Sequence, residues 1–542
     1  MIFHRIENKL RRAFGVCQIV KPTEDETIAL NNLRDQIPKK LRNQFIKAHK
    51  GEVLIEAFAR IERIGQHSSI IFALKESGYR IVVLLYAPHK PLMDAYRLLG
   101  VDKFDFLSNY TNQEEPVLLE EMTMKARLNG PFGMAYENLP VGTIATSTIM
   151  RKLRVGSIDL DRPNDYEHFK EALKDALIYA DAACELFQKR SPHLVIMIDR
   201  GYSPMAQVFH RALDCNVDVI TMNGAHRANM LMFKRYSRHN RYMHPSSLSE
   251  NTWTQLMNSV EARETSVAVF TEMNECYQNE EWYGEVGTQF NTSIMDVDEV
   301  RNILKLRPNC KVACIFPHLF WDATFFWGDD LFDNYQHWFE EVVAVAERIV
   351  GVEWIVKVHP ANNVKNQRDG YYGELLEESI LRNMFQQLPK NLHIISTNDG
   401  ISTYSLFEVM DYCLTVRGTI GLEAASHGIP TLTAGTGRYD RRGFTIDSDT
   451  RNEYLSKLEN IEDIPPMTDE QREHATLYAY GIFNLRPTPL KVISMSYRRD
   501  ETASMEIAFN LNPDVDLKSF YDVKSIRAWI ESGKEDYLIT SL

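Results

Sequence analysis

The sequence predicts an α/β protein with two Rossmann-like domains that face each other across a cleft, and with extra helices at both ends. Two separate series of short apolar segments carry this prediction, one beginning at Gly51 and the other at Lys311. Helical segments alternate with these apolar runs, which implies parallel sheets covered on both faces. Several of the runs end in glycine or polar turns, and parallel sheets bind ligands at such strand ends.

The 542 residues divide into five expected regions, separated by changes in pattern and polarity. The two Rossmann-like domains are joined by a polar linker, and we expect the C-terminal helices to cross back to the first domain. The regions are an N-terminal helical extension (1–45), the first domain (46–275), the linker (276–299), the second domain (300–465) and the C-terminal helices (466–542).

The N-terminal 20 residues show an amphipathic helical pattern. Phe3, Ile6, Leu10 and Phe14 recur at helical spacing, with basic residues between them. Such a helix usually packs against its own domain, and we favour that interpretation. Peripheral contact with a membrane surface is the alternative.

In the first domain, strands are expected at 52–58 and 80–86, around a helix at 65–78. Prolines and glycines interrupt residues 110–160, which we interpret as inserted helices and loops. A strong helix pattern then covers residues 164–190.

Polar residues close the next two strands of this domain. A buried strand from His193 ends in Asp199, Arg200 and Gly201, which makes Asp199 a candidate general base. A turn-forming Asp199 paired with Arg200 is the alternative. The strand at 217–222 ends in a glycine turn with His226 and Arg227, and His226 could act as a base or hold an anionic group.

The second domain is organised around residues 417–437, which read as a glycine turn, a short helix and a strand. Gly418 permits the turn, and Thr419 is expected to cap the helix. The start of such a helix attracts an anion, and Glu423 lies one turn further on, where it could accept hydrogen bonds from sugar hydroxyls. A βαβ unit with a solvated Glu423 is the alternative.

Two other strand ends should reach the same edge of this sheet. A strand is expected at 353–358 and ends in His359 and Pro360, so Lys357 and His359 point the same way, because side chains alternate along a strand. Ser402, Thr403, Tyr404 and Ser405 begin a helix after the strand at 391–396. Together with Arg417, Gly418, Thr419 and Glu423, these groups suit a sugar nucleotide, with phosphate at the helix starts and ribose at Glu423.

Composition excludes several other classes of protein. The formal net charge of −13 argues against a general nucleic-acid binder. No apolar run approaches the roughly 18 residues that span a bilayer. The seven cysteines are scattered and odd in number, which favours reduced thiols in the cytoplasm. We therefore expect a cytoplasmic protein, with the inner face of a membrane as a further location, and no cofactor.

These segments resemble the bacterial capsule and surface-polysaccharide glycosyltransferases of the GT-B fold, over about residues 190–450. The matching pieces in the second domain are Trp321-Asp322-Ala323, Lys357-Val-His359-Pro360, Ser402-Thr-Tyr404, Thr419-x-Gly421-x-Glu423, Gly428-Ile-Pro430 and the loop from Gly435 to Thr445. In the first domain, the segments 199–204 and 223–227 are similar to the acceptor side of that family.

The resemblance implies a glycosyltransferase that moves a sugar from a nucleotide-sugar donor to a surface glycan or glycolipid acceptor. It assigns donor phosphate binding to His359 and Ser402–Ser405, and acceptor binding to Arg200, Tyr202 and Arg227. The sequence has no Asp-x-Asp on a loop after a strand, so we expect no metal ion and a leaving group stabilised by Lys357, Arg417 and helix dipoles. A sugar-nucleotide epimerase or a non-catalytic glycan- or nucleotide-binding protein remains an alternative function.

Overall fold

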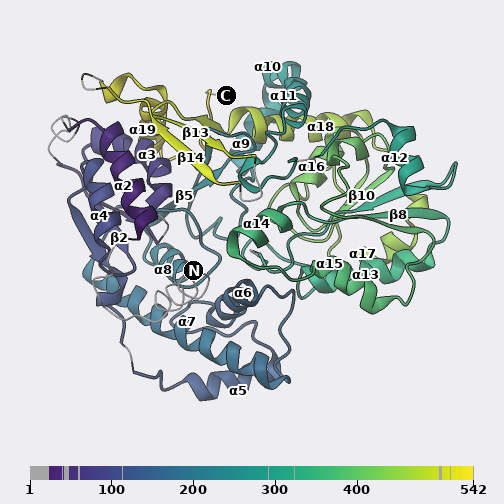
Figure 1. The fold of residues 1–542 in the computed structure, drawn as a ribbon, viewed down its shortest axis with the longest axis horizontal. Coiled ribbons are helices and arrows are strands. Elements are labelled where there is room, and N and C mark those ends of the chain that lie inside the picture. The colour runs from purple at the N-terminus through teal and green to yellow at the C-terminus, as the bar shows by residue number, and fades with distance from the viewer. Residues whose placement is uncertain are drawn as a thin grey trace.

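The fold was analysed in a computed structural model, drawn in Figure 1. The structure describes residues 23–39, 41, 48–58, 61–112, 114–290, 292–322, 324–499, 503–512, 514 and 516–540. The amphipathic helix expected at 1–20 lies outside the described residues.

A seven-stranded sheet forms the first domain, in the order β12-β6-β5-β4-β1-β2-β3. The strands from β3 to β5 pair in parallel, whereas β6 is antiparallel to β5 and β12 is antiparallel to β6. Chain order reverses between β1 and β4. The bounds are β1 Glu52–Glu56, β2 Arg80–Leu85, β3 Lys103–Phe106, β4 Leu194–Met197, β5 Asp218–Gly224, β6 Met230–Tyr236 and β12 Pro487–Pro489.

A five-stranded parallel sheet forms the second domain, on the right of Figure 1, in the order β11-β10-β7-β8-β9. Chain order reverses here between β7 and β10. In open parallel sheets, ligands bind outside the carboxyl ends of the strands at such a reversal. The bounds are β7 Lys311–Ile315, β8 Val352–Lys357, β9 Leu392–Ile395, β10 Tyr412–Thr415 and β11 Thr431–Thr433.

Helices cover both faces of each sheet, as the apolar strands require. In β1, Ile55 packs in the core beneath α3 and α19, while Leu54 packs in the core beneath α7 and α8. This alternation explains why β1 reads as a continuous apolar run. The covering helices are α3 Ile64–Glu76, α4 Lys90–Leu98, α7 Pro163–Lys189, α8 Met205–Asp214 and α19 Tyr521–Ser532 in the first domain, and α13 Tyr335–Arg348, α16 Thr419–Ser426, α17 Arg451–Glu459 and α18 Asp469–Tyr480 in the second.

The remaining helices flank or connect the two domains. None of the helices in the described part of the chain combines the length and the hydropathy needed to cross a membrane. Their bounds are α2 Glu24–Gln36, α5 Leu119–Asn129, α6 Val141–Leu153, α9 Glu250–Asn258, α10 Val260–Thr265, α11 Ala268–Gln278, α12 Val297–Leu304, α14 Ala361–Asp369 and α15 Leu376–Met384.

The predicted fold class is confirmed, and two local expectations are corrected. The C-terminal region contains strands as well as helices, because β13 Ile493–Tyr497 and β14 Met505–Phe509 form an antiparallel hairpin. Thr419 is the first residue of α16 and not its cap. Its hydroxyl oxygen accepts a hydrogen bond from Arg438 at 2.8 Å, so it is engaged away from the helix.

The C-terminal region returns to the first domain. Strand β12 extends the first sheet through β6, and α19 packs against α3. The Asp522 carboxylate at the start of α19 accepts hydrogen bonds from the Ser69 hydroxyl of α3 at 2.7 Å and from the backbone of Val492 at 3.1 Å. The first domain is therefore completed by residues that follow the second domain in sequence.

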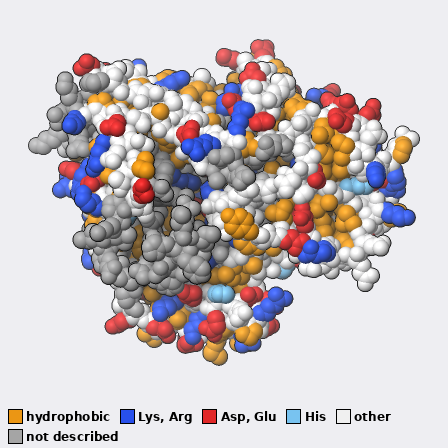
Figure 2. Space-filling model, viewed as in Figure 1, with side chains coloured by type: hydrophobic (Ala, Val, Ile, Leu, Met, Phe, Trp, Pro, Cys, Tyr) orange, Lys and Arg blue, Asp and Glu red, His pale blue; other side chains and the backbone are white. Residues whose placement is uncertain are grey.

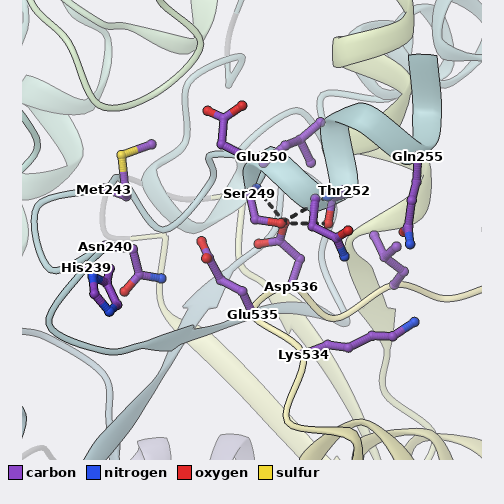
Figure 3. Close-up of a pocket in the computed structure, with 13 residues that line it drawn as sticks. His239, Asn240, Met243, Ser249, Glu250, Thr252, Gln255, Lys534, Glu535 and Asp536 are labelled. Carbon is purple, nitrogen blue, oxygen red and sulfur yellow. Dashed lines mark hydrogen bonds between the residues drawn. The ribbon is translucent and has the colours of Figure 1, made fainter. Parts of the chain in front are cut away.

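A buried ion pair secures this return. The ammonium of Lys234 on β6 lies 2.9 Å from the Asp536 carboxylate, and both side chains are fully buried. Asp536 also accepts the backbone N–H of Ser249 at 2.7 Å, as the dashed lines in Figure 3 show. Ser249 and Asp536 line a pocket of about 350 Å³ between α9 and the C-terminal segment.

Ion pairs at the surface contribute less to folding stability than this buried pair. On the face shown in Figure 2, acidic and basic side chains are interspersed. Arg498 and Glu506 form one such pair at 2.7 Å, with both side chains more than half exposed. Exposed pairs contribute about 0–1 kcal/mol, whereas removing one partner of a buried pair costs about 3–5 kcal/mol.

We expect Asp536→Ala to destabilise the protein by about 3 kcal/mol, because Lys234 then loses its buried carboxylate and keeps the partly exposed Glu535 and the Ser247 carbonyl as partners. Urea unfolding followed by tryptophan fluorescence measures the change. Glu506→Ala is the matched control and should change the free energy of unfolding by less than about 0.5 kcal/mol. Equal effects of the two substitutions would contradict this assignment.

Candidate functional site

The carboxyl ends of β7 and β10 meet where the strand order of the second sheet reverses. His318 lies three residues beyond β7, and its Nε2 accepts the backbone N–H of Arg417 at 3.2 Å. Gly418 follows in a tight turn, where an added Cβ would lie 2.8 Å from the Thr415 hydroxyl. Helix α16 then begins without a side-chain cap, so its first N–H groups and positive dipole end can bind an anion.

Arg438 brings a guanidinium to this helix start. It donates hydrogen bonds to the Thr419 hydroxyl at 2.8 Å, to the Arg417 carbonyl at 3.1 Å and to the Ser246 hydroxyl of the first domain at 3.3 Å. Arg438 was not among the residues predicted from the sequence, although it lies within the loop from Gly435 to Thr445 that resembles the glycosyltransferase family. The signal that could have identified Arg438 was a cation in the loop after β11, the strand that pairs with β10.

Two histidines beside Arg438 are neutral. Burial lowers the pKa of His244 and of His318 well below the usual range, and nearby arginines lower both further. His244 is fixed by its backbone N–H, which donates to Gly437 at 2.7 Å. These imidazoles can therefore donate or accept hydrogen bonds without adding charge.

Lys357 closes β8 as an ammonium without a counter-ion. It is only 4% exposed, and among the residues that the structure describes none forms a hydrogen bond or ion pair with it. Burial lowers the pKa of Lys357 to about 8, and the charge of the Asp399 carboxylate opposes this lowering. A buried charge without a partner is costly, so this lysine is suited to a bound anion.

His359 lies beside Lys357, as the alternation of side chains predicted. Burial lowers the pKa of His359 to about 4, with further lowering from Lys365 and Lys357. Its Nδ1 lies 3.2 Å from the backbone nitrogen of Ala361 and accepts that N–H. The proton of the neutral ring is therefore on Nε2, which can donate to a ligand.

Ser402–Ser405 hold the linker to the second domain. The Ser402 hydroxyl donates to the Gln289 side chain at 3.0 Å, and the Ser405 hydroxyl accepts the backbone N–H of Met295 at 2.9 Å. Tyr404 packs its ring against Tyr277 at 5.0 Å, and the partly buried Thr403 begins a short 3-10 helix, η5 (Thr403–Leu406). The structure gives Ser402 and Ser405 these internal partners in place of the expected donor phosphate.

Arg417 and Glu423 are also committed to the protein interior. Arg417 is buried and donates to the carbonyls of Trp327 at 2.6 Å and Asp329 at 3.1 Å, and to the Asp330 carboxylate. The buried Glu423 accepts the Tyr277 hydroxyl at 2.6 Å, and burial raises its pKa to about 7. In place of the expected contacts with phosphate and ribose, Arg417 holds the loop at 327–330 and Glu423 joins α16 to α11.

The reversal point of the first sheet carries two acids. Asp199 follows β4, and its carboxylate accepts the backbone N–H groups of Arg200 at 2.6 Å and Gly201 at 3.0 Å. Glu56 is the last residue of β1 and is buried. Burial raises the pKa of Glu56 to about 7, and the charge of Asp199 contributes to the rise. The sequence analysis missed Glu56, a charged residue at the end of an apolar strand.

Arg200 and Tyr202, which follow Asp199, are oriented into the protein. Arg200 is buried, donates to the carbonyls of Arg241 and Met243, and stacks on the rings of Tyr236 and Trp327. It therefore has a structural role and is not exposed to an acceptor as we had expected. Tyr202 donates its hydroxyl to the Asp322 carboxylate of the second domain at 2.6 Å.

His226 and Arg227 follow β5 and contact Glu272 on α11. The His226 imidazole contacts the Glu272 carboxylate at 2.8 Å, and burial lowers its pKa. Cys276 completes a group whose possible ligand atoms lie within 4.8 Å of one another. Arg227, however, donates to the same Glu272 oxygen at 2.8 Å and also pairs with Glu275 and Glu281. The guanidinium of Arg227 thus already balances the Glu272 carboxylate that a metal ion would otherwise bind.

One carboxylate connects the reversal points of the two sheets. Asp322, in the loop after β7, accepts hydrogen bonds from Tyr202 and Arg151 of the first domain and from Lys365 of the second. The charge of Arg151 also interacts with Asp199, and that of Lys365 with His359. The acids of the first domain and the anion-binding groups of the second domain therefore lie on opposite sides of one ion network.

Comparison with known proteins gives structural similarity only. No protein-family model matches the chain, and no curated protein matches its sequence. A β-Kdo 2,4-transferase, KpsC from Thermosulfurimonas dismutans, is 13% identical, with a TM-score of 0.32, over 56% of this chain and 87% of that one. The calicheamicin glycosyltransferase CalG4 is 14% identical, with a TM-score of 0.28, over 80% of this chain and 94% of that one.

A UDP-GlcNAc 2-epimerase from Neisseria meningitidis, solved with UDP-GlcNAc, is similar to a comparable degree. It is 14% identical, with a TM-score of 0.25, over 80% of this chain and 96% of that one. The similar structures thus include a β-Kdo transferase and another glycosyltransferase alongside a UDP-GlcNAc 2-epimerase.

We expect Lys357→Ala and Arg438→Ala each to weaken the binding of UDP by tenfold or more, since losing a charge-assisted hydrogen bond costs about 1.5–3 kcal/mol. Isothermal titration calorimetry measures the affinity. Lys311→Ala is the matched control, because Lys311 lies at the opposite, amino end of β7 and pairs with Asp411. Unchanged affinity in both site variants would place the anion elsewhere.

Proposed function

We propose that the chain is a glycosyltransferase that moves a sugar from a nucleotide-sugar donor to a glycan or glycolipid acceptor. The observation that carries the proposal is the buried ammonium of Lys357, to which the described residues offer no hydrogen bond or ion pair, at the same carboxyl edge of the second sheet as the uncapped start of α16. A donor phosphate would supply the missing negative charge. The resemblance to capsule and surface-polysaccharide transferases supports a surface glycan as the acceptor, with the reaction in the cytoplasm or at the inner face of the membrane.

The second domain would hold the donor. Lys357, Arg438 and the N–H groups of α16 would bind the phosphates, and the Nε2–H of His359 would donate a further hydrogen bond. As the bond between sugar and phosphate breaks, negative charge grows on the departing phosphate oxygen. Preorganised cations and a helix N-terminus stabilise such charge without reorganising, so the proposed mechanism needs no metal ion.

The first domain would supply the base. In a direct displacement, the acceptor O–H bond breaks as the oxygen attacks the anomeric carbon, and a carboxylate takes the proton. We propose Asp199 for this role, because it follows β4 at the reversal of the first sheet and two backbone N–H groups fix the position of one of its oxygens. His226 is engaged with Glu272, and Arg227 with three glutamates, so we no longer propose either as a base or an acceptor contact.

The test combines binding with turnover. UDP-, GDP-, CMP- and dTDP-sugars are screened by thermal shift, because a bound donor stabilises only the folded state. The stabilising donor is then incubated with candidate glycan acceptors. Transfer supports the proposal, whereas a changed sugar without transfer indicates an epimerase, and binding without any turnover indicates a non-catalytic protein.

With the donor identified, Asp199→Asn should lower the transfer rate at saturating donor by roughly 10²–10⁴-fold while donor affinity stays intact. Asp161→Asn is the control, because Asp161 is an exposed carboxylate of the same domain that pairs with Arg127. A near-normal rate in the Asp199 variant would exclude it as the base.

A further inference from the structure

Two histidines follow neighbouring strands at the carboxyl edge of the second sheet. His318 lies three residues beyond Ile315, the last residue of β7, and His359 lies three residues beyond Val356, which is paired with Ile315 on β8. Because the two strands are parallel and in register, both histidines leave the sheet at the same level. Both imidazoles are partly exposed, so a ligand at this edge of the sheet can reach them.

The ring of His318 is fixed beside the start of α16. Its Nε2 accepts the backbone N–H of Arg417 at 3.2 Å, and the ring stacks on Tyr335 with 4.4 Å between the centroids. Its Cε1 faces Gly418, the residue before α16, since a Cβ added to Gly418 would lie 3.6 Å from this atom. Both ring nitrogens are bonded to Cε1, so the Nδ1 of His318 also lies close to the helix start that can bind an anion.

A backbone contact sets the tautomer of each ring. A backbone N–H group can only donate, so the ring nitrogen that accepts it carries no proton. In His318 this nitrogen is Nε2, and the proton is on Nδ1. In His359 it is Nδ1, which accepts the N–H of Ala361 at 3.2 Å, and the proton is on Nε2. Both rings are therefore neutral, and each keeps one N–H group to which no described residue offers an acceptor.

We propose that His318 is a further phosphate-binding residue: its Nδ1–H donates a hydrogen bond to the anion at the start of α16, and the Nε2–H of His359 donates to the same ligand. That this ligand is a nucleotide-sugar donor rests on the proposed function, whereas the two hydrogen bonds do not. The phosphates of a nucleotide carry more acceptor oxygens than negative charges. Neutral N–H donors can therefore bind them beside the cations of Lys357 and Arg438 without adding further positive charge.

The opposite tautomers of the two histidines allow a crossed test. A glutamine amide reaches the position of the Nε2 of histidine, and an asparagine amide reaches that of Nδ1. His318→Gln therefore keeps an acceptor for the Arg417 N–H and loses the Nδ1 donor, whereas His318→Asn keeps a donor and loses the acceptor. At His359 the two substitutions exchange their effects, because there Nδ1 is the acceptor and Nε2 the donor.

We expect His318→Gln and His359→Asn each to weaken the binding of UDP and of inorganic pyrophosphate by about tenfold, with melting temperatures close to that of the wild-type protein. His318→Asn and His359→Gln should keep the affinity and lower the melting temperature by roughly 2 °C, because a backbone N–H loses its acceptor. Calorimetric titration and thermal unfolding measure the two effects. His337→Gln is the control and should change neither, because His337 is a partly exposed imidazole on α13 that pairs with the exposed Asp333.

Unchanged affinity in His318→Gln overturns the proposal. An equal loss in His318→Gln and His318→Asn also overturns it, because the ring would then only support the turn before α16, and so does a wild-type protein that binds neither probe. Should one His318 variant fail to fold, NMR of the wild-type protein labelled with ¹⁵N-histidine decides the question. The imidazole N–H signal of His318, assigned by its absence from the other variant, should shift on addition of pyrophosphate, and a signal that does not shift counts against His318. The crossed pattern without sugar transfer to any acceptor would instead count against the proposed function alone.

Discussion

The carboxylate of Asp322 is the contact on which the arrangement of the two domains depends. It belongs to the second domain but accepts hydrogen bonds from Arg151 and Tyr202 of the first, and it also binds Lys365. Burial alone would raise its pKa, but Lys365 and Arg151 hold the pKa below the usual range, so Asp322 stays ionised. Without this charge, the cations of Arg151 and Lys365 would face each other between the two domains. Asp322 is thereby shared by groups on both sides of the domain interface.

The positive charge of the second-domain site comes from few groups. Its histidines are neutral because burial lowers their pKa values, so the charge comes from Lys357, Arg438 and the helix dipole. Lys357, with a pKa of about 8, is mostly protonated at neutral pH. An anion that binds beside it favours the protonated form, so binding above pH 8 would be coupled to the uptake of a proton.

Sequence patterns identified strand ends well and side-chain directions poorly. The apolar run before Lys357 and the glycine turn at Gly418 predicted which segments meet, because alternation and turn chemistry are local properties. Arg417 and Arg438 show the limit of this approach. Arg417 precedes this turn and Arg438 contacts it from the loop after β11, yet Arg417 is directed into another loop and Arg438 reaches the helix start. Glu423 likewise lies on the predicted helix, but its contact with Tyr277 depends on α11, which is distant in sequence.

The return of the chain to the first domain has a consequence for biosynthesis. Strand β12 and Asp536 are made after the whole second domain, yet one extends the first sheet and the other balances a lysine buried in it. During synthesis, the N-terminal half therefore emerges from the ribosome while the edge of its sheet at β6 is still unpaired and the charge of Lys234 is not yet balanced by Asp536. The N-terminal half cannot reach its final form before the last residues emerge, and a nascent chain of this kind is exposed to aggregation for most of its synthesis.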